Sequence, residues 1–272
     1  MRIFFPYIAG LVMLLSCANS DPKNSTPAPT PAPTPAPAQT RIKVYTLDVV
    51  AEYPHDVTAY TQGLFFHEGQ MYESTGQYGL SSFRKVDHIS GNALDRFGFD
   101  DDYFVEGSVI LGDNLYILTW ESKIVFVYDA KTLKFKKKCD YPREGWGLTT
   151  DGTSLIASDG SSTLYFMDSD LNVTRKISVT ANSKPIRWLN ELEYIDGKIW
   201  ANVYTTDEIA IINPSNGNIE GVINCNGLLP RKLRKPDTDV LNGIAYNPQD
   251  KKIYLTGKNW PKLYEIRLVE AK

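Results

Sequence analysis

The chain has 272 residues, in which 29 Lys and Arg stand against 32 Asp and Glu, for a formal net charge of −3 and a pI near 5.7. A slightly acidic chain has no excess of basic residues to bind phosphates, so we expect no nucleic-acid partner. The sequence also holds no HExxH, CxxC or GxSxG motif, so the commonest zinc and nucleophile sites have no signature here.

Residues 1–17 have the order of an export signal. A basic residue precedes an apolar run, which is too short and too early in the chain for a spanning helix and ends in Leu-Leu-Ser-Cys. The position of Cys17 resembles a bacterial lipobox, in which cleavage leaves a lipidated N-terminal cysteine. We therefore expect export and a lipid anchor at Cys17 on a bacterial membrane, facing the periplasm or the cell surface. An ordinary cleaved signal with an incidental cysteine is the alternative.

Residues 18–41 contain the run NSTPAPTPAPTPAPAQT. Proline alternating with small residues cannot build a core and favours extended polyproline II. We interpret this segment as a semi-rigid spacer between anchor and domain. A ligand for an SH3-type domain is the alternative.

Residues 42–272 are rich in short β-type runs separated by Gly, Asp and Asn turns, and these runs repeat at intervals of roughly 44 residues. Each repeat opens with a strand that begins at a polar or aromatic residue. The five starts are Gln62, Glu106, Trp146, Asn190 and Asn242. A second strand follows a turn, as in QMYESTG, NLYILTW and KIYLTGK, and a third and a fourth strand come next.

Four antiparallel strands at this period describe a propeller blade, so the sequence predicts an all-β, five-bladed β-propeller. The fifth repeat lacks its outer strand, and the segment RIKVYTLDVVAEY before the first repeat is expected to supply it. Cys139 and Cys225 fall near the outer strands of the second and fourth blades. These blades are not neighbours, and a disulfide needs Cα atoms within about 7 Å, so we expect free thiols.

Innermost strands line the channel of a propeller, and equivalent positions converge at one mouth. Both the starts of the first strands and the ends of the second strands are expected there, because antiparallel pairing brings them together. The pooled set suits a small polar substrate in a partly desolvated cup. It contains Gln62, Glu73, Trp120, Trp146, Asn190, Tyr204 and Lys258. The alternative is that these polar groups only satisfy backbone or hold water.

Several blocks in order resemble the glutamine cyclotransferase family, the plant and bacterial type of glutaminyl-peptide cyclotransferase. They are YTQGLFF, YESTGQYG, EGWGLTTDG, LNELEYIDGKIWANVY, DVLNGIAY and LTGKNWPKLYEI, and the similarity runs from about Val44 to Val269. The resemblance implies a five-bladed propeller that converts N-terminal glutaminyl residues of peptides to pyroglutamate and releases ammonia.

The resemblance also implies roles for individual residues. It places the catalytic carboxylate at Glu73, with Asn190 and Lys258 as its partners. It assigns substrate contacts to Gln62, Trp120 and Trp146, and to Tyr204, where the family pattern commonly has Trp.

The residue types fit this reaction on chemical grounds. A carboxylate can take a proton from the attacking amine and return it to ammonia, while a lysine and an amide polarise the carbonyl. Enclosure by Trp120 and Trp146 is expected to raise the pKa of Glu73, and Lys258 to lower it. No cofactor or catalytic metal is required, although a structural metal in the central channel is possible. We expect a monomer.

Two other functions remain open at this stage. One is a non-catalytic propeller that binds peptides or glycans. The other is a calcium-dependent propeller lactonase, which would need several convergent carboxylates.

Overall fold

The computed structural model describes residues 41–271, which form 22 β-strands and one short 3₁₀-helix at Arg231–Leu233. The predicted signal, the lipidation site at Cys17 and nearly all of the predicted linker lie outside the described residues. Within residues 41–271, no helix is long and apolar enough to cross a membrane.

Three sheets contain four antiparallel strands each, paired in chain order. The first sheet is β2 (Thr61–His67), β3 (Gln70–Thr75), β4 (Ser82–Asp87) and β5 (Asn92–Gly98). The second is β6 (Val105–Leu111), β7 (Asn114–Thr119), β8 (Ile124–Asp129) and β9 (Phe135–Asp140). The third is β10 (Leu148–Thr150), β11 (Leu155–Ala157), β12 (Thr163–Met167) and β13 (Val173–Ser178).

The fourth sheet has eight strands in the order β16-β17-β18-β19-β1-β22-β21-β20. Its strands are β16 (Leu189–Ile195), β17 (Lys198–Val203), β18 (Glu208–Ile212), β19 (Ile219–Asn224), β20 (Leu241–Asn247), β21 (Lys252–Gly257), β22 (Lys262–Glu270) and β1 (Lys43–Pro54). The first strand, β1, pairs antiparallel with the last strand, β22, and pairs with β19 in parallel at 43–45 alone. A small hairpin of β14 (Thr180–Ala181) and β15 (Lys184–Pro185) forms a separate two-stranded sheet, joined by a single bridge from Thr180 to Asn218.

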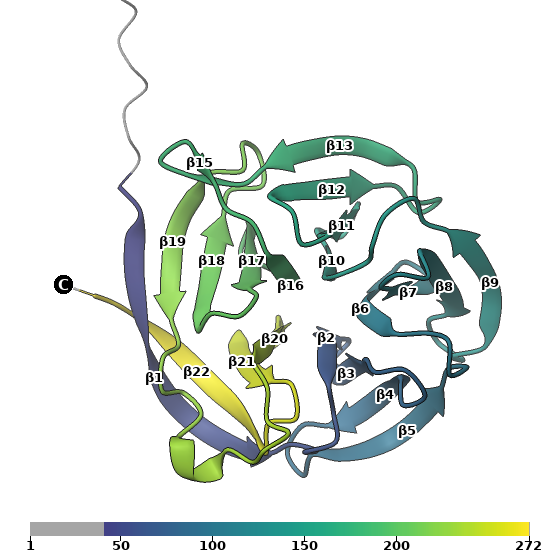
Figure 1. Ribbon diagram of the computed structural model, residues 1–272, viewed down its shortest axis with the longest axis horizontal. Helices are drawn as coiled ribbons and strands as arrows, with labels where there is room; N and C mark the ends of the chain where they lie inside the picture. Colours follow the sequence, from purple (N-terminus) through teal and green to yellow (C-terminus); the bar gives the residue numbers. More distant parts are fainter. Residues whose placement is uncertain (1–40, 272) are drawn as a thin grey trace, which may run out of the picture. The chain divides into compact units, whose positions relative to one another are not determined.

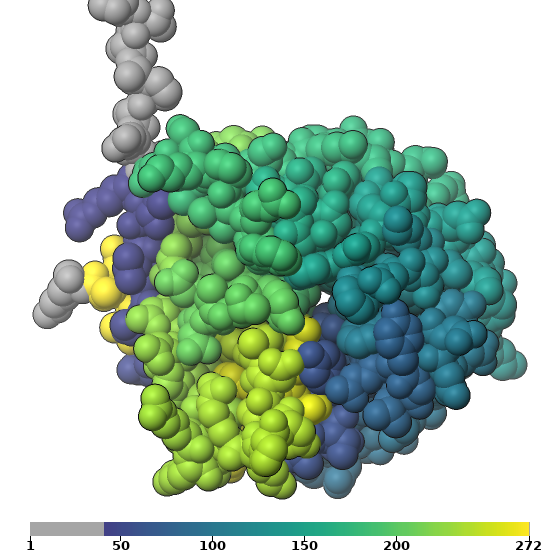
Figure 2. Space-filling view, viewed as in Figure 1, coloured from purple at the N-terminus to yellow at the C-terminus, as the bar shows by residue number. Residues whose placement is uncertain are grey.

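The sheets radiate from a common axis, with β2, β6, β10, β16 and β20 innermost (Figure 1). A narrow opening lies where these strands meet (Figure 2). This is the arrangement of a β-propeller, so the predicted all-β propeller class is confirmed.

The hydrophobic core forms five clusters, four between the faces of neighbouring sheets and one between the β16–β19 and β20–β22 parts of the eight-stranded sheet. One cluster packs Phe65 and Phe83 of the first sheet against Ile117 and Phe126 of the second. The outer strands β5 and β9 are mostly exposed. The apolar runs of the inner and middle strands are therefore buried on both faces, which explains why they read as nearly continuous rather than alternating.

Tight turns join the strands where the sequence provides residues that adopt a left-handed backbone. Glu68-Gly69 links β2 to β3 with φ values of 50° and 78°, and Asp196-Gly197 links β16 to β17 with values of 47° and 78°. Such two-residue turns match the twist of the flanking strands, which accounts for the predicted hairpins.

Cys139 and Cys225 are free thiols, the first partly buried and the second buried. They lie on β9 and directly after β19, in different sheets. The expectation that they do not form a disulfide is confirmed.

Candidate functional site

Four of the five inner strands, all but β10, share a distortion at the point where they enter the centre of the ring. The pairing register shifts between Thr61 and Gly63 in β2, and the shift recurs at the starts of β6, β16 and β20. Such β-bulges re-aim a side chain out of the pleat. The residues in the bulges include Gln62, Glu106, Asn190 and Asn242, four of the five predicted strand starts.

The residue after each predicted start is glycine in four of the five units, and at three of them, Gly63, Gly107 and Gly147, backbone from an adjacent strand or sheet approaches closely. A Cβ at Gly107 would lie 2.5 Å from the amide nitrogen of Leu148, and one at Gly147 would collide with the carbonyl oxygen of Asn190. The close approach is fixed by hydrogen bonds such as Gly107 N to Trp146 O at 2.7 Å. Because glycine has no side chain, the backbones of neighbouring sheets come into direct contact here, and this contact fixes the positions of the site residues.

Glu191 takes the place of that glycine in β16. Its carboxylate is 1% exposed and accepts hydrogen bonds from Leu64 N at 3.2 Å and Ile244 N at 2.9 Å. Burial, and then the neighbouring Glu193, raise the pKa of Glu191 well above its usual range. Glu191 thus joins β16 to β2 and β20 across the centre of the ring.

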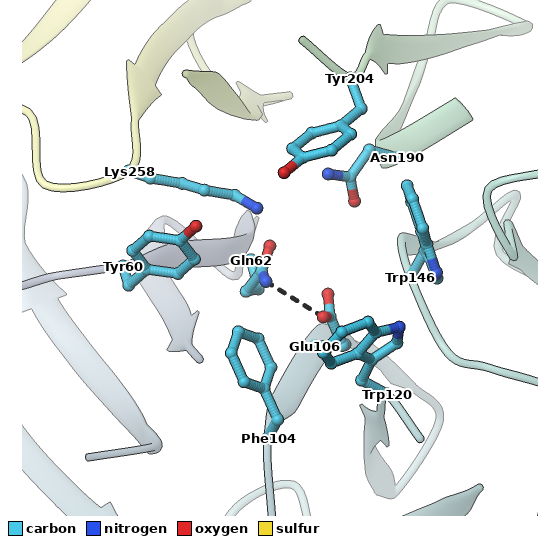
Figure 3. Close-up of a pocket in the computed structure, with 9 residues that line it drawn as sticks. All are labelled: Tyr60, Gln62, Phe104, Glu106, Trp120, Trp146, Asn190, Tyr204 and Lys258. Carbon is cyan, nitrogen blue, oxygen red and sulfur yellow. Dashed lines mark hydrogen bonds between the residues drawn. The ribbon is translucent and has the colours of Figure 1, made fainter. Parts of the chain in front are cut away.

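A cavity of about 200 Å³ opens over the bulged residues (Figure 3). Polar groups converge on a space that is otherwise walled by aromatic rings. The lining residues are Tyr60, Gln62, Phe104, Glu106, Trp120, Trp146, Asn190, Tyr204 and Lys258. The structure therefore brings together every predicted site residue of the domain except Glu73.

Glu106 is the carboxylate of this cavity. It is 5% exposed, and Gln62 Nε2 donates a hydrogen bond to its Oε1 at 3.0 Å. Burial raises the pKa of Glu106 well above its usual range, and this effect outweighs the nearby ammonium of Lys258. Such a group holds a proton at a higher pH than an ordinary carboxyl group, as an acid–base catalyst must.

Lys258 reaches the cavity from the turn after β21. Its Nζ lies 4.8 Å from the ring centre of Tyr60 and 5.0 Å from that of Tyr204. Burial lowers the pKa of Lys258, against the opposing effect of Glu106 and Asp239. The two rings hold the ammonium through cation–π contacts, which leaves its hydrogen atoms available to a ligand.

The two tryptophans are held by a shared acceptor. Trp120 Nε1 and Trp146 Nε1 donate to Glu144 Oε2 at 2.9 and 3.2 Å. Tyr204 meets Trp146 edge to face, with ring centres 5.7 Å apart. Tyr204 therefore extends the aromatic wall at the position predicted for it.

Asn190 lies in the bulge of β16, and its side chain faces the cavity (Figure 3). Its Oδ1 is buried and has no hydrogen-bond partner among the described residues. An unsatisfied buried amide of this kind is costly, and a ligand in the cavity would relieve the cost.

The structure places Glu73 elsewhere. It is a regular residue of β3, paired with Leu64 and Arg84, and no bulge turns it toward the cavity. Its Oε1 accepts a hydrogen bond from Thr61 Oγ1 at 2.7 Å and lies 3.0 Å from His55 Nε2. The expected position of Glu73 at the channel mouth, opposite Asn190 and Lys258, therefore differs from the observed one, and the reason is the regular pleat of β3.

The surroundings of Glu73 also differ from the expected ones. Burial favours its neutral form, but His55 and Arg84 outweigh burial and hold the pKa of Glu73 below its usual range. The tryptophans that were expected to enclose it enclose Glu106 instead.

Sequence reasoning placed Glu106 at a strand start but did not count it among the site residues, and it missed Tyr60, Phe104 and Glu144. The signal for Glu106 was present, because it occupies the same repeat position as Gln62 and Asn190. Glu144 lies in an irregular segment before β10, for which the repeat pattern makes no prediction.

Among residues 41–271, no group of three or more His, Cys, Asp and Glu side chains is arranged to hold a metal ion. The convergent carboxylates that a calcium-dependent lactonase would need are therefore not found in this part of the chain.

Comparisons with known proteins agree with the geometry of the cavity. A sequence model of the glutamine cyclotransferase family matches residues 18–268. The chain belongs to this family. It is 44% identical over 234 residues to the glutaminyl-peptide cyclotransferase of Arabidopsis thaliana, covering 84% of this chain and 73% of that protein. The crystal structure of Myxococcus xanthus glutaminyl cyclase matches with a TM-score of 0.79 and 32% identity, over 85% of this chain and all of that one.

Proposed function

We propose that the chain is a glutaminyl-peptide cyclotransferase whose acid–base catalyst is Glu106. The enzyme cyclises an N-terminal glutaminyl residue to pyroglutamate and releases ammonia. The observation that carries this assignment is the convergence of Glu106, Lys258 and Asn190 in one aromatic cavity, in a chain that belongs to this family.

The reaction is intramolecular, so its first requirement is a folded substrate. The α-amine must approach the γ-carboxamide carbon of the same residue, and a walled cavity of about 200 Å³ favours this compact conformer over an extended one. Trp120, Trp146 and Tyr204 supply flat apolar walls for the methylene groups.

Glu106 carries out the proton transfers of the reaction. As the new carbon–nitrogen bond forms, its carboxylate takes a proton from the amine, and it then delivers that proton to the departing ammonia. The hydrogen bond from Gln62 fixes the orientation of the carboxyl group. Its raised pKa suits it to both steps.

Lys258 and Asn190 act on the carbonyl oxygen. The ammonium and the amide N–H group can donate to the oxyanion that develops when the amine attacks. Each such donor stabilises the transition state by roughly 2.7–4 kcal/mol. Since these proton transfers balance the reaction, we propose that no cofactor or catalytic metal takes part. Activity unchanged by prolonged EDTA treatment is the expected result.

A pair of substitutions tests the assignment of the acid. Glu106→Gln is expected to lower the kcat for a Gln-Ala peptide at least about 100-fold, measured as ammonia release or by mass spectrometry. Glu265→Gln is the matched control, because Glu265 is equally buried but lies on β22, bonded to Tyr53 and Lys252. Full activity of a folded Glu106→Gln protein would remove Glu106 from the mechanism. An inactive wild type would favour a propeller that binds peptides without turnover.

We also propose that the ring has five blades. In this interpretation the eight-stranded sheet is two blades, β16–β19 and β20–β22 with β1, joined by the short parallel contact at 43–45. The five core clusters support the count, since a closed ring has as many interfaces as blades. Pairing of β1 with β22 from Tyr45 to Pro54 supports closure by the N-terminal strand. Deleting residues 43–54 is expected to abolish cooperative unfolding.

We further propose that the enzyme is exported, lipidated at Cys17 and held at a bacterial membrane as a monomer. The support is the lipobox-like sequence and the proline-rich spacer that follows it. Labelled palmitate is expected to enter the wild type but not Cys17→Ala. Light scattering of the domain without residues 1–40 tests the oligomeric state. A structural metal in the central channel stays a prediction.

A further inference from the structure

Trp188 lies directly before β16, two residues from Asn190, and its ring is next to that of Trp146, which lines the cavity. It is 54% exposed, which is unusual for the largest apolar side chain. Its backbone adopts a left-handed conformation with φ of 65°. This conformation is strained for a bulky residue, and such strain concentrates at functional positions.

The strained backbone is fixed rather than free. Trp188 N donates to Gly160 O at 2.8 Å, and Trp188 O accepts from Tyr204 N at 2.8 Å. Gly160 itself packs against the indole of Trp146, which leaves no room for a Cβ. The backbone of Trp188 is therefore fixed to Tyr204 of the cavity wall and to Gly160, which packs against a second wall residue, Trp146.

The ring of Trp188 continues that wall outward. Its centre lies 6.1 Å from that of Trp146, with the planes tilted by 40°. Trp146 lines the cavity, whereas Trp188 does not. An apolar shelf of two indole rings thus runs from the cavity to the solvent.

A peptide substrate must pass this rim. The cavity of about 200 Å³ has room for the glutaminyl residue alone, and the peptide bond that follows has to leave through the mouth. The second residue of the substrate is therefore the first whose side chain lies outside the cavity.

We propose that Trp188 and Trp146 form a subsite for the side chain of the residue that follows the N-terminal glutamine, with preference for aromatic and large apolar side chains. This inference rests on the proposed cyclotransferase activity and adds a substrate class to it. Tyr78, 49% exposed beside Phe104, is the other exposed aromatic at the rim. Trp188 is the better candidate, because its backbone is both strained and fixed to the wall.

The test compares kcat/KM for Gln-Phe-Ala-amide and Gln-Gly-Ala-amide. An aromatic contact is worth about 0.5–1.5 kcal/mol, so the wild type is expected to prefer the Phe peptide roughly 2- to 12-fold. Trp188→Ala is expected to bring this ratio close to one, and Trp188→Phe to retain most of it. Leu94→Ala is the control, since Leu94 is 60% exposed on the outer strand β5, and it is expected to leave the ratio as in the wild type.

A stability measurement separates a ligand role from a packing role. Trp188→Gly relieves the strained backbone but loses the contact with the ring of Trp146, and the two effects are of similar size, so the variant is expected to keep Tm within about 4 °C of the wild type while abolishing the preference. A larger fall in Tm would show that Trp188 is a packing residue and would overturn the proposal.

Two further outcomes are distinguishable. Cyclisation of both peptides by the wild type with equal kcat/KM, or a ratio that Trp188→Ala leaves unchanged, contradicts the subsite. Failure of the wild type to cyclise either peptide contradicts the proposed function instead.

Discussion

Because Glu73 forms a buried pair with His55, substitution of Glu73 is expected to lower the stability of the fold rather than the catalytic rate. Their side chains are 5% and 2% exposed and lie 3.0 Å apart. Removing one partner of a buried pair leaves an uncompensated charge, so Glu73→Ala is expected to lower the free energy of unfolding by about 3–5 kcal/mol. Glu73→Gln keeps an acceptor for Thr61 and is expected to cost less, roughly 1.5–3 kcal/mol, as one lost charged hydrogen bond.

The geometry also fixes the protonation of His55. Its Nδ1 lies 2.7 Å from Trp260 O, which can only accept a hydrogen bond, so Nδ1 carries a proton. Burial lowers the pKa of His55, but Glu73 and the Trp260 carbonyl outweigh burial and raise it above 6.5. The pKa of Glu73 is lowered below 4.5. Both shifts therefore favour the imidazolium–carboxylate form of the native pair.

The pH dependence follows from these two directions. Because the pKa of His55 is raised, its contribution is complete below about pH 6.5 and is lost as pH rises through the folded-state pKa. Because the pKa of Glu73 is lowered, its contribution is complete above about pH 4.5 and is lost as pH falls through its folded-state pKa. The stability difference between wild type and Glu73→Gln is thus expected to be largest between about pH 4.5 and 6.5.

Urea unfolding at pH 5.5 and 8.5 measures this difference, with kcat recorded on the same folded samples. Glu265→Gln serves as control, because neither Lys252 nor Tyr53 titrates across this interval in the unfolded chain. An equal stability difference at both pH values would show that His55 is uncharged. If Glu73→Gln leaves the stability unchanged but abolishes cyclisation, Glu73 takes part in catalysis and the structural role given to it here is refuted.

Three further results are expected. Lys258→Met is expected to lower kcat at least about 100-fold with little change in Tm, because one oxyanion donor is lost, and steady-state kinetics with thermal melts check this. Gly147→Ala is expected to lower the free energy of unfolding by about 1–3 kcal/mol, because the added Cβ collides with the backbone at the start of β16. Gly98→Ala is the control, since its added Cβ has its nearest neighbour 3.8 Å away, and it is expected to change the free energy of unfolding little in the same urea titration. In the domain without residues 1–40, a thiol reagent is expected to modify Cys139 in the native state but Cys225 only after unfolding, since burial raises the pKa of Cys225 to about 12.

The fold was predictable because its information is local and repeated. Each unit has its own turn residues, such as Asp196-Gly197, and an apolar strand that aligns with those of the other units. A strand that is ambiguous in one unit can therefore be assigned from the equivalent strands of the others. The repeat alignment also placed most of the site, because equivalent positions in a ring converge by symmetry. The predicted residues that do line the cavity are Gln62, Trp120, Trp146, Asn190, Tyr204 and Lys258.

The choice of Glu106 as the proposed acid was only partly predictable. Glu73 and Glu106 are both acidic residues in buried strands, and the difference between them is a register shift in β6 that β3 lacks. The repeat alignment places Glu106 at a strand start, but the bulge that turns its side chain also depends on the approach of Leu148 to Gly107, a contact between sheets that the sequence of one strand does not show. His55 was overlooked for a related reason, since its partner becomes apparent only when the segment after β1 is placed beside β3.

The pairing of β1 with β22 sets the order in which the domain can fold. The residues that it joins, such as Lys43 and Glu270, are 227 positions apart, so the loop they close includes almost the whole domain. During synthesis β1 is made first, and it cannot pair with β22 until that last strand has been made. The entropy of closing so long a loop is lost before the contacts that repay it form, and topologies of this kind fold slowly. Until β22 forms, the edge of β1 stays unpaired, and an unpaired strand edge can pair with another chain and aggregate.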